Sequence, residues 1–359
     1  MKVLVLGGTG AMGIHLCDML VKGGHDVNVT SRTRSGITNS IRYIQGNAQE
    51  DTFLNKLLSQ KWDVIVDFMV YSTPHFQKRY VSLLNNTNQY VFISSARVYA
   101  NSEESITENS PRLLDVSTDE EYLRTDEYAL SKARQEDLLF ACKMNNWTIV
   151  RPYITYDNER LQLGALEKED WLYRVLNGKS IITLKEMQNK KTTLTSGRDV
   201  ARGILALLGS QNALGEAFHI TSNISLTWGY ITNIYINVLK NKGYNPNLIE
   251  DDLKSFSSWR KAKYQIYYDR LYDRTFNNDK INDFINTSEF IGCSDGLEEC
   301  LLNFIDNQQF VFKPINWREE ALKDKIAGEF TQLSEISSFK DRIKYLLFRT
   351  TPLMMTRMN

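Results

Sequence analysis

The sequence has few of the residues that build metal sites and disulfide frameworks. None of the four cysteines forms a CxxC pair, and the four histidines are scattered along the 359 residues. A histidine-based metal site is therefore not expected, and no metal is predicted. Without a secretory signal, the cysteines are typical of reduced thiols in a cytoplasmic protein.

Long apolar runs are also missing. The first residues, MKVLVLGG, contain an apolar run only from Val3 to Leu6, and glycines end it. A secretory signal peptide needs a longer apolar core. No stretch of about 18 apolar residues is present to span a membrane. We therefore predict a cytoplasmic protein with no transmembrane segment.

The chain carries no excess charge of either sign, because 43 basic residues balance 43 acidic ones. A broad electrostatic attraction to nucleic acid is therefore not encoded, and we predict no nucleic-acid partner. The length exceeds the roughly 250–300 residues at which one hydrophobic core stops growing. One large domain with a smaller lobe, or two domains, is expected.

The first half of the chain alternates short apolar runs with segments of helical periodicity. Regular alternation of this kind predicts an α/β fold, namely a Rossmann-type, doubly wound parallel sheet with a smaller C-terminal substrate-binding lobe. Strands are expected at 2–7, 26–31, 40–46, 62–70, 89–95, 147–152 and 216–221, and helices at 11–24, 51–60, 75–86, 125–145, 198–210 and 227–243.

After Pro152 the segments become more polar and less regular, which suggests a division between domains. We assign residues 1–155 to the dinucleotide-binding domain, with 190–225 returning to it. Residues 156–189 and 226–320 form the predicted substrate-binding lobe, and 321–359 a helical C-terminal tail. This tail is both basic and apolar, so it could dock on the body, on a second subunit or on a membrane surface.

Three glycines stand between the first expected strand and the first expected helix. Gly7 permits a tight turn, Gly10 lets the backbone approach a pyrophosphate, and Gly13 permits close packing of helix on strand. The helix N-terminus offers N–H groups and a partial positive charge to phosphates. This context predicts a dinucleotide site, to which Thr9 and Met12 also belong.

The end of the second strand predicts which dinucleotide is bound. A carboxylate there favours NAD, whereas an arginine accommodates the 2′-phosphate of NADP. The sequence at this point is Ser31, Arg32, Thr33 and Arg34, with no carboxylate. Because a guanidinium can grip a phosphate in two places, we favour NADP over NAD, with Ser31 and Arg32 as contacts.

A serine, a tyrosine and a lysine follow in an order that suits proton transfer. Ser95 ends a strand, and Tyr128 and Lys132 are four residues apart on one face of a helix. A phenol is too weak an acid, at a pKa of about 10, to exchange protons readily at neutral pH. A nearby ammonium stabilises the phenolate, and a serine hydroxyl can hold the substrate oxygen during hydride transfer.

These motifs, GGTGAMG, SSARVY, YALSK and RPYITY, resemble the extended and atypical short-chain dehydrogenase/reductase superfamily. The group that they resemble comprises the NAD(P)-dependent nucleotide-sugar epimerases and dehydratases. The resemblance covers residues 1 to about 240 and is looser beyond. It implies that Ser95 and Tyr128 are catalytic. It also implies that Lys132 both tunes the tyrosine and binds the nicotinamide ribose.

Departures from the family's motifs argue against two of the family's reactions, dehydration and the epimerisation of the fucose-synthase branch. The 4,6-dehydratases of the family have an acid and a base where this chain has Ala96 and Arg97. The fucose-synthase branch has a cysteine where Ala96 stands. Residues 156–158 differ from the family's Tyr-Gly-Pro, so substrate contacts there cannot be transferred. The acidic segment 101–127 is either a lid or a solvated loop.

Two enzymatic activities remain, and the sequence does not separate them. One is reduction of a 4-keto nucleotide-sugar, and the other is C4 epimerisation through a transient 4-keto intermediate. The alternative from another class is a non-catalytic, dinucleotide-sensing or RNA-binding relative on the same fold. The resemblance also implies a homodimer through two helices that flank the sheet, one of which carries Tyr128, whereas the sequence of that helix fits packing on the chain's own body equally well.

Overall fold

The computed structural model describes residues 1–350, which divide into two compact units. Unit 1 comprises Met1–Asp157, Thr193–Ser225 and Arg274–Cys293. Unit 2 comprises Asn158–Thr192, Leu226–Asp273 and the chain from Ser294 onward. Residues 274–293, which we expected in the second lobe, thus cluster with unit 1.

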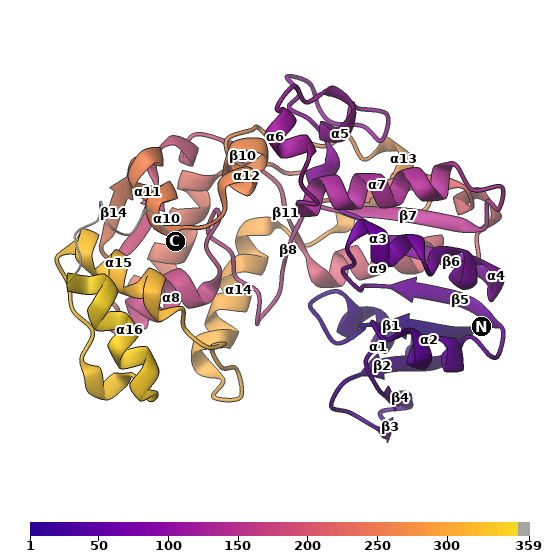
Figure 1. Cartoon of the computed structure of the whole chain (residues 1–359), viewed down its shortest axis with the longest axis horizontal. Helices are drawn as coiled ribbons and strands as arrows, with labels where there is room; N and C mark the ends of the chain where they lie inside the picture. The colour runs from indigo at the N-terminus through magenta and orange to yellow at the C-terminus, as the bar shows by residue number, and fades with distance from the viewer. Residues whose placement is uncertain (351–359) are drawn as a thin grey trace. The chain divides into compact units, whose positions relative to one another are not determined.

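Unit 1 contains the strands and helices of the expected alternation (Figure 1). Its strands are β1 (Lys2–Leu6), β2 (Asp26–Ser31), β3 (Gly36–Thr38), β4 (Ile41–Gln45), β5 (Trp62–Asp67), β6 (Thr87–Ile93), β7 (Trp147–Pro152), β8 (Ile154–Tyr156), β11 (Leu194–Ser196) and β12 (Glu216–Ile220). Its helices are α1 (Gly13–Lys22), α2 (Asp51–Leu57), α3 (Thr73–Gln77), α4 (Tyr80–Asn85), α5 (Leu113–Val116), α6 (Glu120–Leu123), α7 (Tyr128–Phe140), α9 (Gly197–Leu207) and α13 (Asp279–Asn282), with short 3₁₀ turns η1 (Ala96–Val98), η3 (Gln211–Ala213) and η5 (Thr287–Glu289).

Eight of these strands form one sheet in the order β12-β7-β6-β5-β1-β2-β4-β3. Every neighbouring pair is parallel except β3 and β4, which are antiparallel. The strand order reverses direction on either side of β1, as in a doubly wound sheet. The predicted fold class is therefore confirmed.

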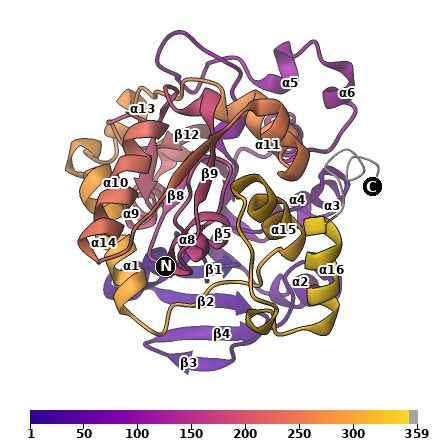
Figure 2. The ribbon, with the colours of Figure 1, turned by 90° about the vertical axis from the view of Figure 1, so that its left-hand side faces the viewer.

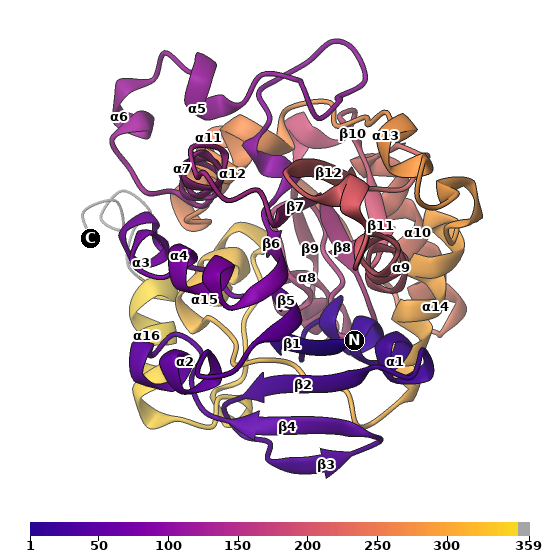
Figure 3. The ribbon, with the colours of Figure 1, turned by 90° about the vertical axis from the view of Figure 1, so that its right-hand side faces the viewer.

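Helices cover both faces of this sheet because alternate strand residues point to opposite sides. Val3 and Val5 of β1 belong to a core cluster with Leu16 of α1 and Ile204 of α9. Leu4 and Leu6 belong instead to a cluster with residues of α2, α4 and α7. Figure 3 shows α1 and α9 on one side of the sheet and α2, α4 and α7 on the other.

Two expected helices differ from the structure. The segment 75–86 forms two helices, α3 and α4, because the chain bends at Arg79. The Arg79 guanidinium turns inward there and donates to the carbonyl of Ala48 at 3.0 Å. The helix expected at 125–145 spans only Tyr128–Phe140. Its cap is Glu127, since Asp126 accepts hydrogen bonds from Thr73 instead.

Unit 2 is mostly helical, and Figure 2 shows α16 running beside α15. Its strands are β9 (Ile181–Leu184), β10 (Lys191–Thr192), β13 (Leu226–Thr227) and β14 (Leu248–Asp251). Its helices are α8 (Lys168–Leu176), α10 (Trp228–Asn241), α11 (Leu253–Trp259), α12 (Lys263–Gln265), α14 (Cys293–Asp306), α15 (Trp317–Ala327) and α16 (Phe339–Thr350), with the 3₁₀ turns η2 (Lys185–Met187) and η6 (Leu333–Glu335) and the short π-helix η4 (Ile266–Arg270). Over residues 1–350, no helix is long and apolar enough to cross a membrane.

A buried group of charges fixes α15 to α8 within unit 2. The Arg174 guanidinium of α8 is inaccessible to solvent and forms ion pairs with Glu320 and Asp324 of α15. Lys179 reaches the same Asp324 carboxylate at 3.0 Å. The C-terminal helices are thereby held to the body of unit 2. The last nine residues of the predicted tail lie outside the described part of the chain.

Candidate functional site

The glycine loop and Ser95 of unit 1 follow the carboxyl ends of two parallel strands, β1 and β6. The sheet places β5 between β1 and β6, and the loops after β1 and β6 begin at Gly7 and Ser94. Ligands of open α/β sheets bind at this edge. The turn η1, which follows Ser95, packs against α7. The structure thus brings Ser95 and the helix of Tyr128 and Lys132 together.

The glycine loop has the geometry of a phosphate cradle. Gly7 has a φ of 73°, a left-handed conformation that favours glycine. A Cβ atom on Gly13 would lie 2.6 Å from Gly8 Cα. The helix α1 can therefore begin this close to the loop only with glycine at position 13. A Cβ on Gly10 would meet no atom within 4 Å, and Thr9 beside it is exposed. The loop therefore leaves open space in front of its backbone.

The N-terminus of α1 completes this cradle. Met12 is the N-cap residue of α1, and no side chain caps the helix there. The first N–H groups of such a helix are available to an anion. These observations fit the pyrophosphate of a dinucleotide at the loop and the helix start.

Two supports of the glycine loop were not found by our sequence reasoning. The Gly7 N–H donates to the Thr30 hydroxyl of β2 at 3.0 Å. A side chain on Gly197, the first residue of α9, would collide with the carbonyl of Ala11. The sequence signal that could have indicated Gly197 is Ser196, because serine is typical of an N-cap and the helix then begins at the glycine that follows.

The end of β2 holds the residues predicted to contact the adenosine ribose. The Ser31 hydroxyl accepts from the N–H groups of Thr33 at 3.3 Å and Arg34 at 3.1 Å, which turns the chain sharply. Arg32 is exposed in this turn. Arg34 lies over the ring of Tyr43, with 5.5 Å between the guanidinium carbon and the ring centroid. The two arginines therefore have different surroundings.

Tyr128 and Lys132 lie one turn apart on α7, but their environments differ. Tyr128 is half-buried and begins the helix. Lys132 is only 2% exposed, and its ammonium donates to the Ile93 carbonyl at the end of β6 at 2.7 Å. Burial lowers the pKa of Lys132 to about 8, although the carboxylates of Asp67 and Glu136 oppose this shift.

The two serines after β6 have separate partners. The Ser94 hydroxyl donates to the buried Glu136 carboxylate at 2.6 Å. The Ser95 hydroxyl instead caps the turn η1, accepting from the Arg97 N–H at 3.2 Å. Ser94 is thus engaged in the interior, and Ser95 is the serine of the pair that lies at the turn beside α7.

Arg97 connects this turn to Tyr128. Its guanidinium pairs with Glu127 at 2.6 Å and lies over the Tyr128 ring, 5.3 Å from its centroid. Glu127 in turn accepts from the Ala129 N–H at 2.8 Å, which caps α7. The Arg97 side chain therefore contributes to holding the first residue of α7 in place, a contact that the sequence did not predict.

Asp67 is a buried carboxyl group at the end of β5 that sequence reasoning missed. It is inaccessible to solvent and accepts hydrogen bonds from the hydroxyls of Tyr71 at 3.1 Å and Tyr90 at 2.9 Å. Burial raises the pKa of Asp67 above its ordinary value. The Tyr71 carbonyl accepts from Gln135 of α7 at 2.9 Å, so this group also helps to fix α7.

A buried ion pair joins α7 to β7. Both nitrogens Nε and Nη2 of Arg151 donate to the carboxylate of Glu136, each at 2.8 Å. The exposure of both residues is at most 2%. Arg151 also donates to the Tyr99 hydroxyl at 3.0 Å. The motif residues Tyr99 and Arg151 therefore act together in positioning α7 on the sheet.

The acidic segment 101–127 is attached to α7 by two arginines. Arg112 donates to Asp137 at 2.7 Å and to the carbonyl of Ala133 at 3.2 Å. Arg134 of α7 donates to the carbonyls of Leu123 and Thr125, each at 2.6 Å. The end of the segment is thus tied to the helix that carries Tyr128.

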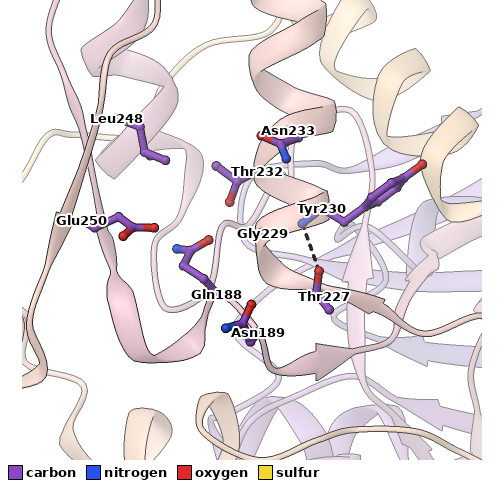
Figure 4. A pocket seen from close by; sticks show the side chains of 9 residues that line it. All are labelled: Gln188, Asn189, Thr227, Gly229, Tyr230, Thr232, Asn233, Leu248 and Glu250. Carbon is purple, nitrogen blue, oxygen red and sulfur yellow. Dashed lines mark hydrogen bonds between the residues drawn. The ribbon is translucent and has the colours of Figure 1, made fainter.

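Unit 2 contains an open pocket of ≈ 390 Å³ (Figure 4). The lining residues are Gln188, Asn189, Thr227, Gly229, Tyr230, Thr232, Asn233, Leu248 and Glu250. This lining has amides, hydroxyls and one carboxylate but no lysine or arginine. Its chemistry suits neutral groups such as sugar hydroxyls better than phosphate. Among the described residues, no group of three or more histidine, cysteine, aspartate or glutamate side chains could hold a metal ion.

Residues 3–221 match the family model described as the NAD dependent epimerase/dehydratase family. Among curated proteins, the chain is 25% identical over 244 residues to the chloroplast stem-loop binding protein of 41 kDa b of Arabidopsis thaliana, covering 63% of this chain and 60% of that protein. It is 36% identical over 135 residues to the UDP-glucose 4-epimerase of Lactobacillus helveticus, covering 31% and 41%. The chain thus spans about half the length of these relatives.

Solved structures share the fold at low sequence identity. A UDP-glucuronic acid 4-epimerase from Bacillus cereus, in complex with UDP-glucuronic acid and NAD, has a TM-score of 0.63 at 18% identity. The match covers 85% of this chain and 99% of that one. An epimerase from Methanothermobacter thermautotrophicus has a TM-score of 0.66 at 16% identity, covering 86% and 93%.

Loss of the Glu136 charge should destabilise the protein strongly. Glu136→Gln leaves the Arg151 cation buried without its carboxylate, which we expect to lower the free energy of unfolding by about 3–5 kcal/mol. Urea denaturation followed by circular dichroism measures this change. The matched control is Glu120→Gln, whose partner Arg124 is 78% exposed, and it should unfold like the wild type. Equal stability of Glu136→Gln and the wild type would contradict the role given to this pair.

Proposed function

The chain belongs to the NAD dependent epimerase/dehydratase family, and on that premise we propose that it transfers hydride at C4 of a nucleotide-activated sugar. The observation that carries the proposal is the placement of Tyr128 and Lys132 on α7, beside the turn that follows Ser95. The UDP-glucose 4-epimerases among its relatives support this substrate class.

The residues of unit 1 fit a nicotinamide dinucleotide. Gly7, Gly10 and Gly13, together with the uncapped N-terminus of α1, would hold the pyrophosphate. Thr9 and Met12 belong to the same loop, and Ser31 and Arg32 would contact the adenosine ribose. When bound, the nicotinamide accepts or donates the hydride at the sugar carbon.

Three side chains would carry the proton chemistry. Ser95 donates a hydrogen bond to the sugar oxygen at C4 and fixes its position. Tyr128 removes the proton from that oxygen during oxidation and returns it during reduction. Lys132 supplies positive charge that stabilises the phenolate, and it would also contact the nicotinamide ribose. Its ammonium is already held at the end of β6 by the Ile93 carbonyl.

This machinery suits either a 4-keto-sugar reductase or a C4 epimerase. Both need only one acid–base group and one hydride carrier. A dehydratase would need a further acid and base beside the tyrosine. Ala96 has no ionisable group, and Arg97 is engaged with Glu127. These two positions therefore favour the reductase and epimerase over a dehydratase.

Removal of the Tyr128 hydroxyl separates chemistry from cofactor binding. We expect Tyr128→Phe to lower kcat roughly 10²- to 10⁴-fold, because proton transfer is lost. Its affinity for NADH and NADPH, measured by fluorescence titration, should stay close to that of the wild type. A variant that keeps full activity would exclude Tyr128 as the acid–base.

The exposed Arg32 favours NADP as the cofactor. We expect Arg32→Ala to weaken NADPH binding roughly ten- to hundred-fold, since a charge-assisted contact to the 2′-phosphate is lost. NADH binding should be nearly unchanged. The control Arg42→Ala removes another exposed arginine, on β4, and should affect neither cofactor. Equal losses for NADPH and NADH in Arg32→Ala would remove the phosphate assignment.

We propose that unit 2 binds a nucleotide diphosphate sugar. Calorimetric titration with UDP, dTDP, GDP and CDP should give binding by at least one of them. Heat from none of the four would contradict a nucleotide-sugar substrate. This measurement needs no turnover, so it tests the substrate class independently of Tyr128.

A second function, RNA binding without catalysis, has one observation in its favour. The Arabidopsis relative is named a stem-loop binding protein. Titration with a labelled RNA stem-loop distinguishes the two functions. RNA binding together with no response to the four nucleotides would favour the second function. Nucleotide binding without RNA binding would favour the enzyme.

A further inference from the structure

The C-terminal helix α16 has one face that is fixed to unit 2. The hydroxyl of Tyr345 donates to Asp324 at 2.7 Å and accepts from the Thr331 N–H at 2.7 Å. Tyr345 is inaccessible to solvent, and it packs in a small core with Trp317 and Ile336. This face therefore sets the orientation of the whole helix.

The opposite face of α16 is apolar and exposed. Phe339 is 74% exposed, Ile343 53% and Leu346 36%. These positions follow the spacing i, i+4 and i+7, which places them on one side of a helix. Leu347 is 57% exposed next to them. We call this set, Phe339, Ile343, Leu346 and Leu347, the apolar stripe.

Basic residues border the apolar stripe on both sides. At 100° per residue, Lys340 and Lys344 fall along one border, and Arg342 and Arg349 fall along the other. Asp341 is the one acidic residue of α16. Both arginines donate to backbone carbonyls, Arg342 to Ile336 at 2.6 Å and Arg349 to Glu329 at 3.0 Å. These acceptors carry no formal charge, so the border keeps its cationic character.

We propose that the apolar stripe of α16 docks on the surface of a bilayer that contains anionic phospholipid. A helix that lies in a membrane interface inserts its apolar face between the headgroups, and its flanking cations attract anionic lipids. A symmetric contact between two copies of this chain would instead bring the same basic borders together. That repulsion disfavours a dimer through the stripe.

Flotation of the full chain with lipid vesicles tests this proposal. We expect binding to vesicles of phosphatidylcholine mixed with phosphatidylglycerol and little binding to phosphatidylcholine alone. Ile343→Ser should lower the partition coefficient roughly ten-fold, because an isoleucine no longer enters the interface. The double variant Lys340→Gln, Lys344→Gln should lower it about five-fold per lysine. Higher salt should weaken binding by the wild type.

The matched control is Ile37→Ser. Ile37 is 64% exposed on the edge strand β3 of unit 1, so its loss removes an isoleucine outside α16 that is at least as accessible as Ile343. This control should bind vesicles like the wild type. Equal losses for Ile37→Ser and Ile343→Ser would overturn the proposal, and so would no binding by the wild type to either vesicle. A wild-type dimer that Ile343→Ser converts to monomer, without vesicle binding, would assign the stripe to a second copy.

Discussion

The ion pair between Glu136 and Arg151 is the interaction on which the candidate site of unit 1 depends. It joins the helix of Tyr128 and Lys132 to β7, and through Ser94 it also reaches the end of β6. Two charges buried together cost desolvation free energy, and only good geometry offsets it. The paired Nε and Nη2 contacts supply that geometry. The pair therefore restricts α7 to one position on the sheet.

Much of the fold could be predicted from sequence because its signals are local. Buried strands, glycine positions and helical spacing each depend on a few neighbouring residues, and the parallel sheet followed from their alternation. The failures have equally specific causes. Arg79 breaks a helix because its side chain is drawn toward carbonyls after β4. The helix expected from residue 125 begins only at Tyr128, because the carboxylate of Asp126 accepts a hydrogen bond from Thr73, which is distant in sequence.

The candidate site was predictable only in its outline. Ser95, Tyr128 and Lys132 stand in motifs whose order the sequence displays. The residues that hold them do not form motifs. Asp67, Glu136 and Gly197 acquire their roles through contacts that only folding creates, with Tyr90, Arg151 and Ala11 at 23, 15 and 186 positions away respectively. The candidate residues could thus be named from the sequence, whereas the contacts that hold them in place could not.

The burial of Lys132 changes the pH at which this side chain gains or loses its proton. Burial lowers the pKa of Lys132 to about 8, which is well below the pKa of a lysine on the surface. The charge of this group therefore changes with pH closer to neutrality than that of an exposed lysine. A ligand that favours positive charge there draws a proton from solvent when it binds. Ligand binding at this site and the pH of the solution are therefore thermodynamically linked.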